Sequence, residues 1–227
     1  MDHVDYQGWV DFIVMLFEKY GSNIHNVVDG GCGTGTLISI LEKKGYRVAG
    51  FDRSLEMIRL AQKKSGVPYW QGDLKSISLS PGWDAFLCLY DTIQYLTPEE
   101  MERMLLEVRS ILKQRGILIF DVVTESNVLR YWANYTEVDS DKNWRMIRRS
   151  WFERNRQLQH TEFEISLIEK KTVYQEHHVQ KIYRLEEIEE IGEKTGFDIL
   201  GRFDDFTLNP GSEKSDRVHF VFQRRVS

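Results

Sequence analysis

Apolar residues along this chain fall into two kinds of segment that alternate from residue 9 onward. In one kind they recur every three or four positions, as in a helix with one buried face, and in the other they form short runs typical of strands. The helical spacing predicts helices over 9–20, 37–44, 54–61 and 97–112. The runs predict strands over 27–29, 46–52, 67–71, 83–89 and 117–123. This alternation indicates an α/β fold with a parallel sheet.

The pattern changes between about residues 131 and 184. Charged and aromatic residues dominate there, and Phe163, Ile165 and Leu167 alternate with polar neighbours, which is the period of a half-exposed strand. After this stretch, the pattern predicts one more helix and two more strands, over 184–191, 197–203 and 218–223. We therefore expect two parts: a sheet domain formed by 1–130 and 184–227, and an inserted antiparallel β subdomain over 131–183.

Composition narrows the class of protein. The 227 residues are 41% apolar and include only 4 Pro, which excludes a mainly disordered chain. The net charge of −5 argues against a nucleic-acid partner. The two cysteines are too few for a disulfide framework or a zinc cluster. The sequence shows no signal-peptide core and no apolar run long enough to span a membrane. We therefore expect a cytoplasmic protein with no metal and no membrane contact.

A glycine-rich turn follows the first predicted strand. From residue 27 to residue 37 it reads Val-Val-Asp-Gly-Gly-Cys-Gly-Thr-Gly-Thr-Leu. Gly31, Gly33 and Gly35 would let a ligand approach the backbone and the free N–H groups at the start of the next helix. A dinucleotide-binding turn would need glycines at 31, 33 and 36, but residue 36 is Thr36. The spacing therefore departs from the dinucleotide fingerprint.

With Asp29 before these glycines, the chain resembles the class I S-adenosylmethionine-dependent methyltransferases, whose first motif is an acidic residue followed by Gly-x-Gly-x-Gly. Asp52, at the end of the second strand, resembles the family's acceptor for the ribose hydroxyls. Gly72-Asp73-Leu74, after the third strand, resembles the motif that binds the adenine. The resemblance covers roughly 25–123 and 184–225. It implies a Rossmann-like, doubly wound, mostly parallel seven-stranded sheet, with the antiparallel insertion as a lid.

The resemblance also implies which residues bind S-adenosylmethionine and its product, S-adenosylhomocysteine. They come from the first helix, the glycine turn and the carboxyl ends of the strands. They are Tyr6, Trp9, Asp29, Gly31, Cys32, Gly33, Gly35, Asp52, Arg53, Met57, Gly72, Asp73, Leu74, Leu89, Tyr90 and Tyr95. The spacing of Trp9 and Met57 also fits the buried faces of helices, so a core role for either stays open.

The candidates for catalysis are Tyr6, Asp91 and His178. Methyl transfer from a sulfonium is an in-line displacement that a neutral amine performs with little help, whereas a hydroxyl usually needs a base. Asp91 follows the fourth strand, where it could steer an amine, orient the cofactor or cap a turn. His177 and His178 would point to opposite faces of a strand, so at most one of them is catalytic.

In the small-molecule branch of the family, such insertions shape substrate choice, so we expect methyl transfer to N or O of a small molecule. An RNA or protein methyltransferase is an alternative. Its best support is a cluster of basic residues, Arg145, Arg148, Arg149, Arg154 and Arg156. Ordinary solvent-exposed strand faces would also explain this cluster. An aminopropyl transferase and a non-catalytic S-adenosylmethionine-binding protein also stay open. A homodimer through the exposed sheet of the insertion is a further expectation.

Overall fold

The computed structural model describes residues 4–21 and 23–226. Its body is a seven-stranded sheet with the order β10-β11-β5-β4-β1-β2-β3. The strands are β1 (Asn26–Gly30), β2 (Arg47–Asp52), β3 (Tyr69–Gln71), β4 (Trp83–Cys88), β5 (Leu112–Val123), β10 (Phe197–Asp204) and β11 (Arg217–Arg224). Neighbouring strands run parallel except at β11, which is antiparallel to both β5 and β10. The predicted α/β fold with a mostly parallel sheet is confirmed.

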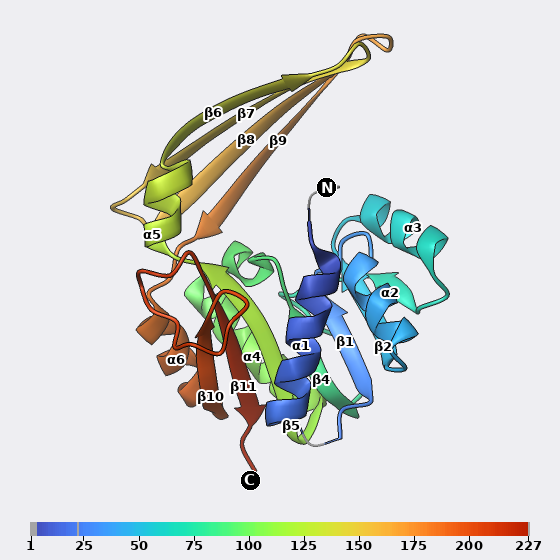
Figure 1. Ribbon diagram of the computed structural model, residues 1–227, viewed down its shortest axis with the longest axis vertical. Helices are drawn as coiled ribbons and strands as arrows, with labels where there is room; N and C mark the ends of the chain where they lie inside the picture. Colours follow the sequence, from blue (N-terminus) through green and yellow to red (C-terminus); the bar gives the residue numbers. More distant parts are fainter. Residues whose placement is uncertain (1–3, 22, 227) are drawn as a thin grey trace.

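Helices cover both faces of this sheet (Figure 1). One face carries α1 (Tyr6–Tyr20), α2 (Thr36–Lys43) and α3 (Leu55–Lys64), and the other carries α4 (Pro98–Ile111) and α6 (Leu185–Lys194). Alternate residues of β5 enter the two cores, with Ile117 and Ile119 on one side and Leu118 and Phe120 on the other. This burial on both faces explains why the central strands are continuous apolar runs.

Local capping sets where the helices begin. The side chain of Asp5 accepts a hydrogen bond from the Gly8 N–H at 2.9 Å, so α1 begins at Tyr6, three residues before the predicted start. Thr97 and Glu100 form a capping box at the start of α4, which begins within the predicted helix. Leu55, at the start of α3, is 37% exposed, although it recurs at the helical spacing of the buried Ile58 and Ala61.

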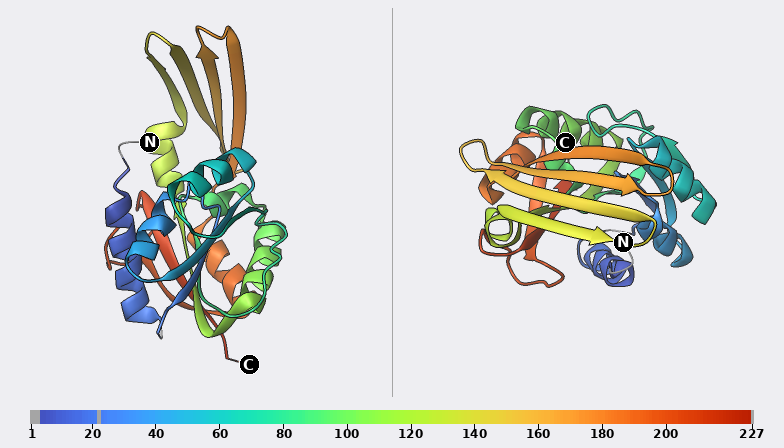
Figure 2. Two further views of the ribbon diagram at one scale, coloured as in Figure 1. Left: turned by 90° about the vertical axis from the view of Figure 1, so that its right-hand side faces the viewer. Right: turned by 90° about the horizontal axis from the view of Figure 1, so that it is seen from above.

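A second, antiparallel sheet stands on the body and extends away from it (Figures 1 and 2). It contains β6 (Asn134–Ser140), β7 (Trp144–Glu153), β8 (Leu158–Leu167) and β9 (Thr172–Lys181), paired in that order. The chain enters it from β5 through α5 (Glu125–Asn127) and the π-helix η2 (Val128–Trp132). Its base lies at the carboxyl edge of the parallel strands, the edge at which open α/β sheets bind ligands. The predicted antiparallel insertion is confirmed.

Candidate functional site

The turn between β1 and α2 has a left-handed backbone that glycine adopts at low cost. Gly31, Gly33 and Gly35 have φ values of 81°, 54° and 69°. Phe51 on β2 anchors the turn, because its carbonyl oxygen accepts hydrogen bonds from the N–H groups of Gly31 (2.8 Å) and Cys32 (3.0 Å). A Cβ at Gly31 or Gly35 would collide with neighbouring side chains, but a Cβ at Gly33 would meet nothing within 4 Å. Gly33 therefore borders open space.

That space belongs to a cavity of about 200 Å³. It is lined by Tyr6, Asp29, Gly31, Cys32, Gly33, Thr34, Thr36, Leu37, Met57, Leu89 and Tyr90. Asp29 is only 4% exposed. Burial, together with the negative charge of Asp52, raises the pKa of Asp29 to about 7. A cation bound beside Asp29 would oppose both effects and favour the ionised carboxylate.

Asp52, at the end of β2, holds the glycine turn in place. Its Oδ2 accepts from the Gly33 N–H at 2.9 Å, and its Oδ1 accepts from the Ser54 N–H at 2.8 Å. Each oxygen keeps a second lone pair that a ligand hydroxyl can use. Asp73 instead accepts from the Lys75 N–H at 2.9 Å, within its own turn.

Two consecutive left-handed residues, neither of them glycine, follow β4. Tyr90 and Asp91 have φ values of 61° and 47°, a conformation that costs roughly 1–2 kcal/mol for each residue. Asp121, on the neighbouring β5, holds both residues there. Its carboxylate accepts from the Tyr90 N–H at 2.7 Å and from the Asp91 N–H at 3.0 Å. The strained turn therefore depends on a buried acidic side chain.

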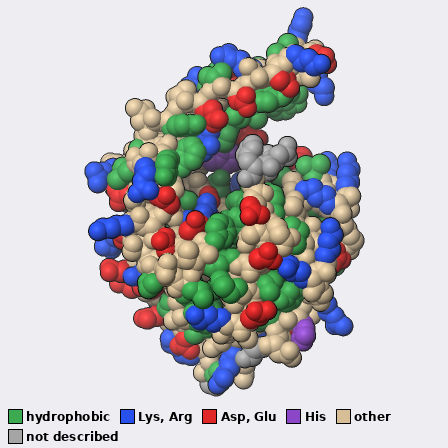
Figure 3. Space-filling model, in the orientation of Figure 1, with side chains coloured by type: hydrophobic (Ala, Val, Ile, Leu, Met, Phe, Trp, Pro, Cys, Tyr) green, Lys and Arg blue, Asp and Glu red, His purple; other side chains and the backbone are tan. Residues whose placement is uncertain are grey.

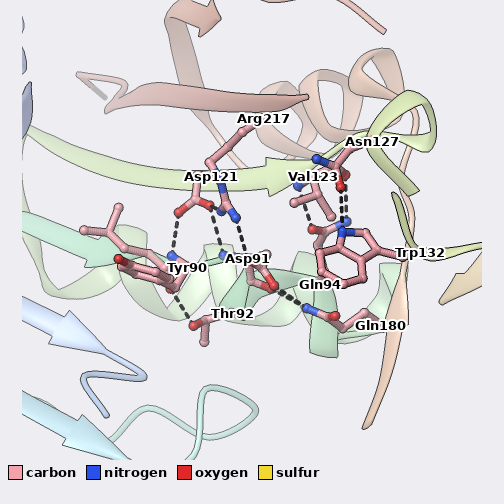
Figure 4. A network of polar contacts seen from close by, with 11 residues as sticks. Tyr90, Asp91, Thr92, Gln94, Asp121, Val123, Asn127, Trp132, Gln180 and Arg217 are labelled. Atoms are coloured by element: carbon pink, nitrogen blue, oxygen red, sulfur yellow. Dashed lines mark hydrogen bonds and ion pairs between the residues drawn. The ribbon is translucent and has the colours of Figure 1, made fainter. Parts of the chain in front are cut away.

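Arg217, on β11, joins Asp121 to Asp91 (Figure 4). Its Nη1 donates to Asp121, and its Nη2 lies 3.0 Å from Oδ1 of Asp91. Burial raises the pKa of Asp121 to about 6, although the Arg217 charge opposes this shift. Burial lowers the pKa of Arg217, but the two carboxylates outweigh it and raise that pKa overall. The three charges form one coupled network beside the cavity.

The β6–β9 sheet binds to the same turn. Gln180, on β9, donates to Oδ2 of Asp91 at 2.6 Å. His178, which lies two residues earlier on the same face, has its Nδ1 3.0 Å from the Tyr95 hydroxyl, and its Nε2 lies 3.3 Å from Glu176. Asp91 thus connects the body to the sheet. As expected for neighbours on a strand, His177 points to the other face, where it stacks on Trp151.

Gln94 forms a second connection at the base of this sheet. It is fully buried in the short helix η1 (Thr92–Tyr95). Its Nε2 donates to the carbonyl oxygens of Val123 (3.1 Å) and Lys181 (3.0 Å), and its Oε1 accepts from the Val123 N–H at 2.8 Å. One amide therefore joins the end of β5 to the end of β9, which fixes where the sheet leaves the body.

Aromatic rings form the wall between α1 and the Tyr90 turn. Trp9 stacks on Tyr90 with ring centroids 4.4 Å apart, and Tyr6 lies 6.0 Å from Tyr90. Trp9 is 5% exposed and lies behind Tyr90 rather than in the cavity wall. Among residues 4–21 and 23–226, the buried Tyr90 hydroxyl has no hydrogen-bond partner. Burial raises the pKa of both Tyr6 and Tyr90.

The five arginines of the insertion do not form one basic patch. Arg148 points to the face of the sheet that carries His178, and Arg145 and Arg149, at odd positions of β7, point to the other face. Arg154 pairs with Glu125 and Arg156 with Glu153 near the base, at 3.3 and 3.5 Å. Their charges are therefore spread over two faces and partly neutralised.

Residues 27–116 match the model of a methyltransferase domain family. Over 99% of its length, the chain is 29% identical to YqeM, a Bacillus subtilis protein whose name describes it as a methyltransferase, and it covers 92% of that protein. Its fold resembles an S-adenosylmethionine-dependent methyltransferase from Clostridium acetobutylicum, with a TM-score of 0.88, 21% identity and coverage of 99% of this chain and 94% of that one. Together these matches support a class I S-adenosylmethionine-dependent methyltransferase.

A second methyltransferase of the same fold is the sugar N-methyltransferase KedS8 from Streptoalloteichus. It superposes on this enzyme with a TM-score of 0.80 at 18% identity, over 98% of this chain and 89% of that one. The agreement extends over both sheets, since nearly the whole of each chain is covered.

The cavity of this methyltransferase brings together about half of the residues expected to bind the cofactor. Those that line it are Tyr6, Asp29, Gly31, Cys32, Gly33, Met57, Leu89 and Tyr90. Asp52 binds the turn through the Gly33 N–H, and Gly35 is the N-cap residue of α2. The others lie outside the cavity wall: Trp9, Arg53, Gly72, Asp73, Leu74 and Tyr95.

Several residues of this site were not predicted from the sequence. Thr34, Thr36 and Leu37 line the cavity, as their place beside the glycines could have indicated. Asp121 is a charged residue inside the apolar run of β5, an anomaly that signals a buried ionic contact. No local signal marks Arg217, because only the sheet order brings β11 beside β5.

Two absences concern the described part of the chain. Within residues 4–21 and 23–226, no group of His, Cys, Asp and Glu side chains could hold a metal ion. In the same ranges, no helix is both long and apolar enough to cross a membrane.

Proposed function

We propose that this methyltransferase acts on a nitrogen or oxygen atom of a small molecule held between the cofactor cavity and the base of the β6–β9 sheet. The observation that carries the proposal is the 2.6 Å hydrogen bond from Gln180 to Asp91, which holds the sheet over the carboxyl edge beside the cavity. A macromolecular acceptor would have to displace this contact, whereas a small molecule would not. The shared fold of KedS8 is in keeping with this class of acceptor.

The residues present fit the cofactor. Gly33 leaves room where any other residue would place a side chain, and Asp29 offers the cofactor's ammonium group a carboxylate already buried in the cavity wall. The free lone pairs of Asp52 would accept the ribose hydroxyls. Met57, in the cavity wall, would contact the adenine. When bound, the cofactor would supply a methyl group on its sulfonium: the acceptor atom would bond to the methyl carbon as the carbon–sulfur bond breaks, and S-adenosylhomocysteine would leave.

Asp91 is the residue that we assign to the acceptor. Arg217 and Gln180 each occupy one of its oxygens, so both oxygens keep a lone pair for an amine or hydroxyl hydrogen of the acceptor. Tyr6, in the cavity wall, would border the path between the two substrates. His178 is bonded to Tyr95 and Glu176 through its two nitrogens, so it would position Tyr95 rather than act as the base. This arrangement favours an amine, which needs no base once neutral.

The test is a transfer assay with isotopically labelled S-adenosylmethionine and three separate acceptor pools. One pool contains small amines and phenols, another contains RNA, and the third contains protein. We expect label to enter the small-molecule pool, and Asp91→Asn to reduce this transfer at least tenfold while cofactor binding stays unchanged. Label that enters only RNA or only protein would refute the proposal.

A further inference from the structure

Arg148 is a half-buried cation without an anionic partner. It lies on the face of the β6–β9 sheet that carries His178 and Gln180. Its Nε is buried without a hydrogen-bond partner, and among residues 4–21 and 23–226 no carboxylate oxygen lies within 4.0 Å of its guanidinium. Glu137 is its cross-strand neighbour, yet the two form no ion pair. Because an unpaired buried charge is costly, this arginine points to a missing anion.

Aromatic rings hold the guanidinium by its faces. Its Cζ lies 4.1 Å from the ring centroid of Trp132, 5.5 Å from that of Phe163 and 5.9 Å from that of Tyr135. Stacking satisfies the flat faces of a guanidinium but leaves the N–H groups at its edge available. Such an edge donates two parallel hydrogen bonds to a carboxylate or phosphoryl group.

The guanidinium lies near the acceptor residue. Trp132 is fixed at the base of the sheet, where its Nε1 donates to Asn127 at 3.1 Å, and its carbonyl oxygen accepts from Gln159 at 3.4 Å. Gln159 is the cross-strand neighbour of Gln180, which binds Asp91. Burial lowers the pKa of Arg148, and the negative charge of Glu137 and, more weakly, that of Asp91 act in the opposite direction.

Arg148 lies on the face of the β6–β9 sheet that is turned toward the body. The face of the β6–β9 sheet that bears Arg148 also bears apolar side chains, among them Met146 and Ile165. Figure 3 shows hydrophobic side chains along the side of this sheet that is turned toward the body, above a hollow. An acceptor in this hollow would meet apolar surface, the Arg148 cation and the carboxylate of Asp91, and the same face of the sheet also carries Glu137 and Glu176.

We infer that Arg148 binds an anionic oxygen group, carboxylate or phosphoryl, on the methyl acceptor, and that Asp91 faces the nucleophilic end of the same molecule. The acceptor is then an amine or hydroxyl compound that also carries an acidic group. This inference rests on the proposed function, because it presupposes a small-molecule acceptor. It adds a specificity residue that sequence analysis had counted only as part of a basic cluster.

Binding is measured by calorimetry on the enzyme saturated with S-adenosylhomocysteine, with benzoate, phenyl phosphate and neutral benzamide as probes. We expect whichever of benzoate and phenyl phosphate binds better to bind at least about tenfold more tightly than benzamide. A pair of charge-assisted hydrogen bonds contributes about this much to affinity. Arg148→Met, which keeps an apolar stem against Trp132, should abolish this preference. Arg149→Met, on the other face of the same strand, is the matched control and should retain it. Unchanged cofactor binding in both variants would show that they are folded.

Transfer assays complete the test with acceptors that differ only in the acidic group, 4-(aminomethyl)benzoate and benzylamine. Higher kcat/KM for the first, lost in Arg148→Met, is the expected result. Equal rates for the two amines, or equal anion binding by Arg148→Met and Arg149→Met, would overturn the inference and leave the proposed function intact. Label confined to RNA or protein would overturn the proposed function itself. Tighter binding of phenyl phosphate than of benzoate would identify the group as phosphoryl.

Discussion

Arg217 and Asp91 lie 126 positions apart in the sequence, yet the Arg217 guanidinium is 3.0 Å from the Asp91 carboxylate at the carboxyl edge of the sheet. The same guanidinium binds Asp121, which in turn holds the left-handed Tyr90–Asp91 turn by its N–H groups. The last strand of the fold therefore sets the geometry of the turn that follows β4. Four predictions follow from this network, the cavity and the contacts of the β6–β9 sheet.

Arg217→Met should lower the free energy of unfolding by about 3 kcal/mol, because it leaves Asp121 as an uncompensated buried carboxylate. Urea denaturation measures this loss. The control is Arg225→Met, whose ion pair with Asp198 is solvent-exposed and should contribute less than about 1 kcal/mol. Equal losses in the two variants would show that the Asp121 contact does not stabilise the fold.

The stability that Asp29 and Asp121 contribute should fall as the pH rises from about 4 to about 7. Asp29 and Asp121 have pKa values raised by burial to about 7 and about 6, above the unfolded value of 3.8. The folded protein therefore binds protons that the unfolded chain releases in this window, and the stability they contribute is full at the acidic end. Asp29→Asn removes one of these protons from the balance. The free energy of unfolding of Asp29→Asn minus that of wild type should be measured at pH 4 and at pH 8. This difference should be more favourable to the variant at pH 8, by on the order of 2 kcal/mol. A constant difference would contradict the prediction.

Gly33→Ala should weaken S-adenosylmethionine binding at least about tenfold, since a methyl group at this position projects into the cavity while the backbone stays at φ 54°. Gly45→Ala is the matched control, because Gly45 also has a positive φ of 96° and open space around it but lies outside the cavity. Thermal denaturation should show comparable losses of stability in both. Calorimetry should show weaker binding of S-adenosylmethionine to Gly33→Ala than to Gly45→Ala. Similar affinities in the two variants would mean that the cofactor binds elsewhere.

Gln180→Met should raise the KM for the acceptor and leave cofactor affinity unchanged, because it removes the hydrogen bond that ties β9 to Asp91. Steady-state kinetics with whichever amine the transfer assay identifies would measure this change. Gln175→Met alters the other face of the same strand and should behave like wild type. If both variants raise KM equally, the β6–β9 sheet affects the acceptor through its overall stability rather than through this contact.

Local signals predicted much of the body. The glycine turn and the apolar run of β4 both appear where the sequence indicated them. The boundary of β5 was less accurate, since the strand begins at Leu112 rather than Ile117. Leu112 pairs with Trp83 across a register shift, a tertiary contact that no local pattern encodes. Trp9 illustrates the same limit, because helical spacing alone did not indicate its stacking on Tyr90.

The sequence by itself determined the class of this enzyme and its cofactor turn, because glycine spacing, helix caps and apolar periodicity are local properties that one segment carries within itself. Tertiary structure decided the environment of the acceptor. Asp91 follows β4, Asp121 lies on β5, Arg217 lies on β11 and Arg148 comes from the insertion. Only strand order and the docking of the second sheet bring their charges together. Electrostatic contacts depend on distance in space rather than in sequence, and folding alone fixes that distance.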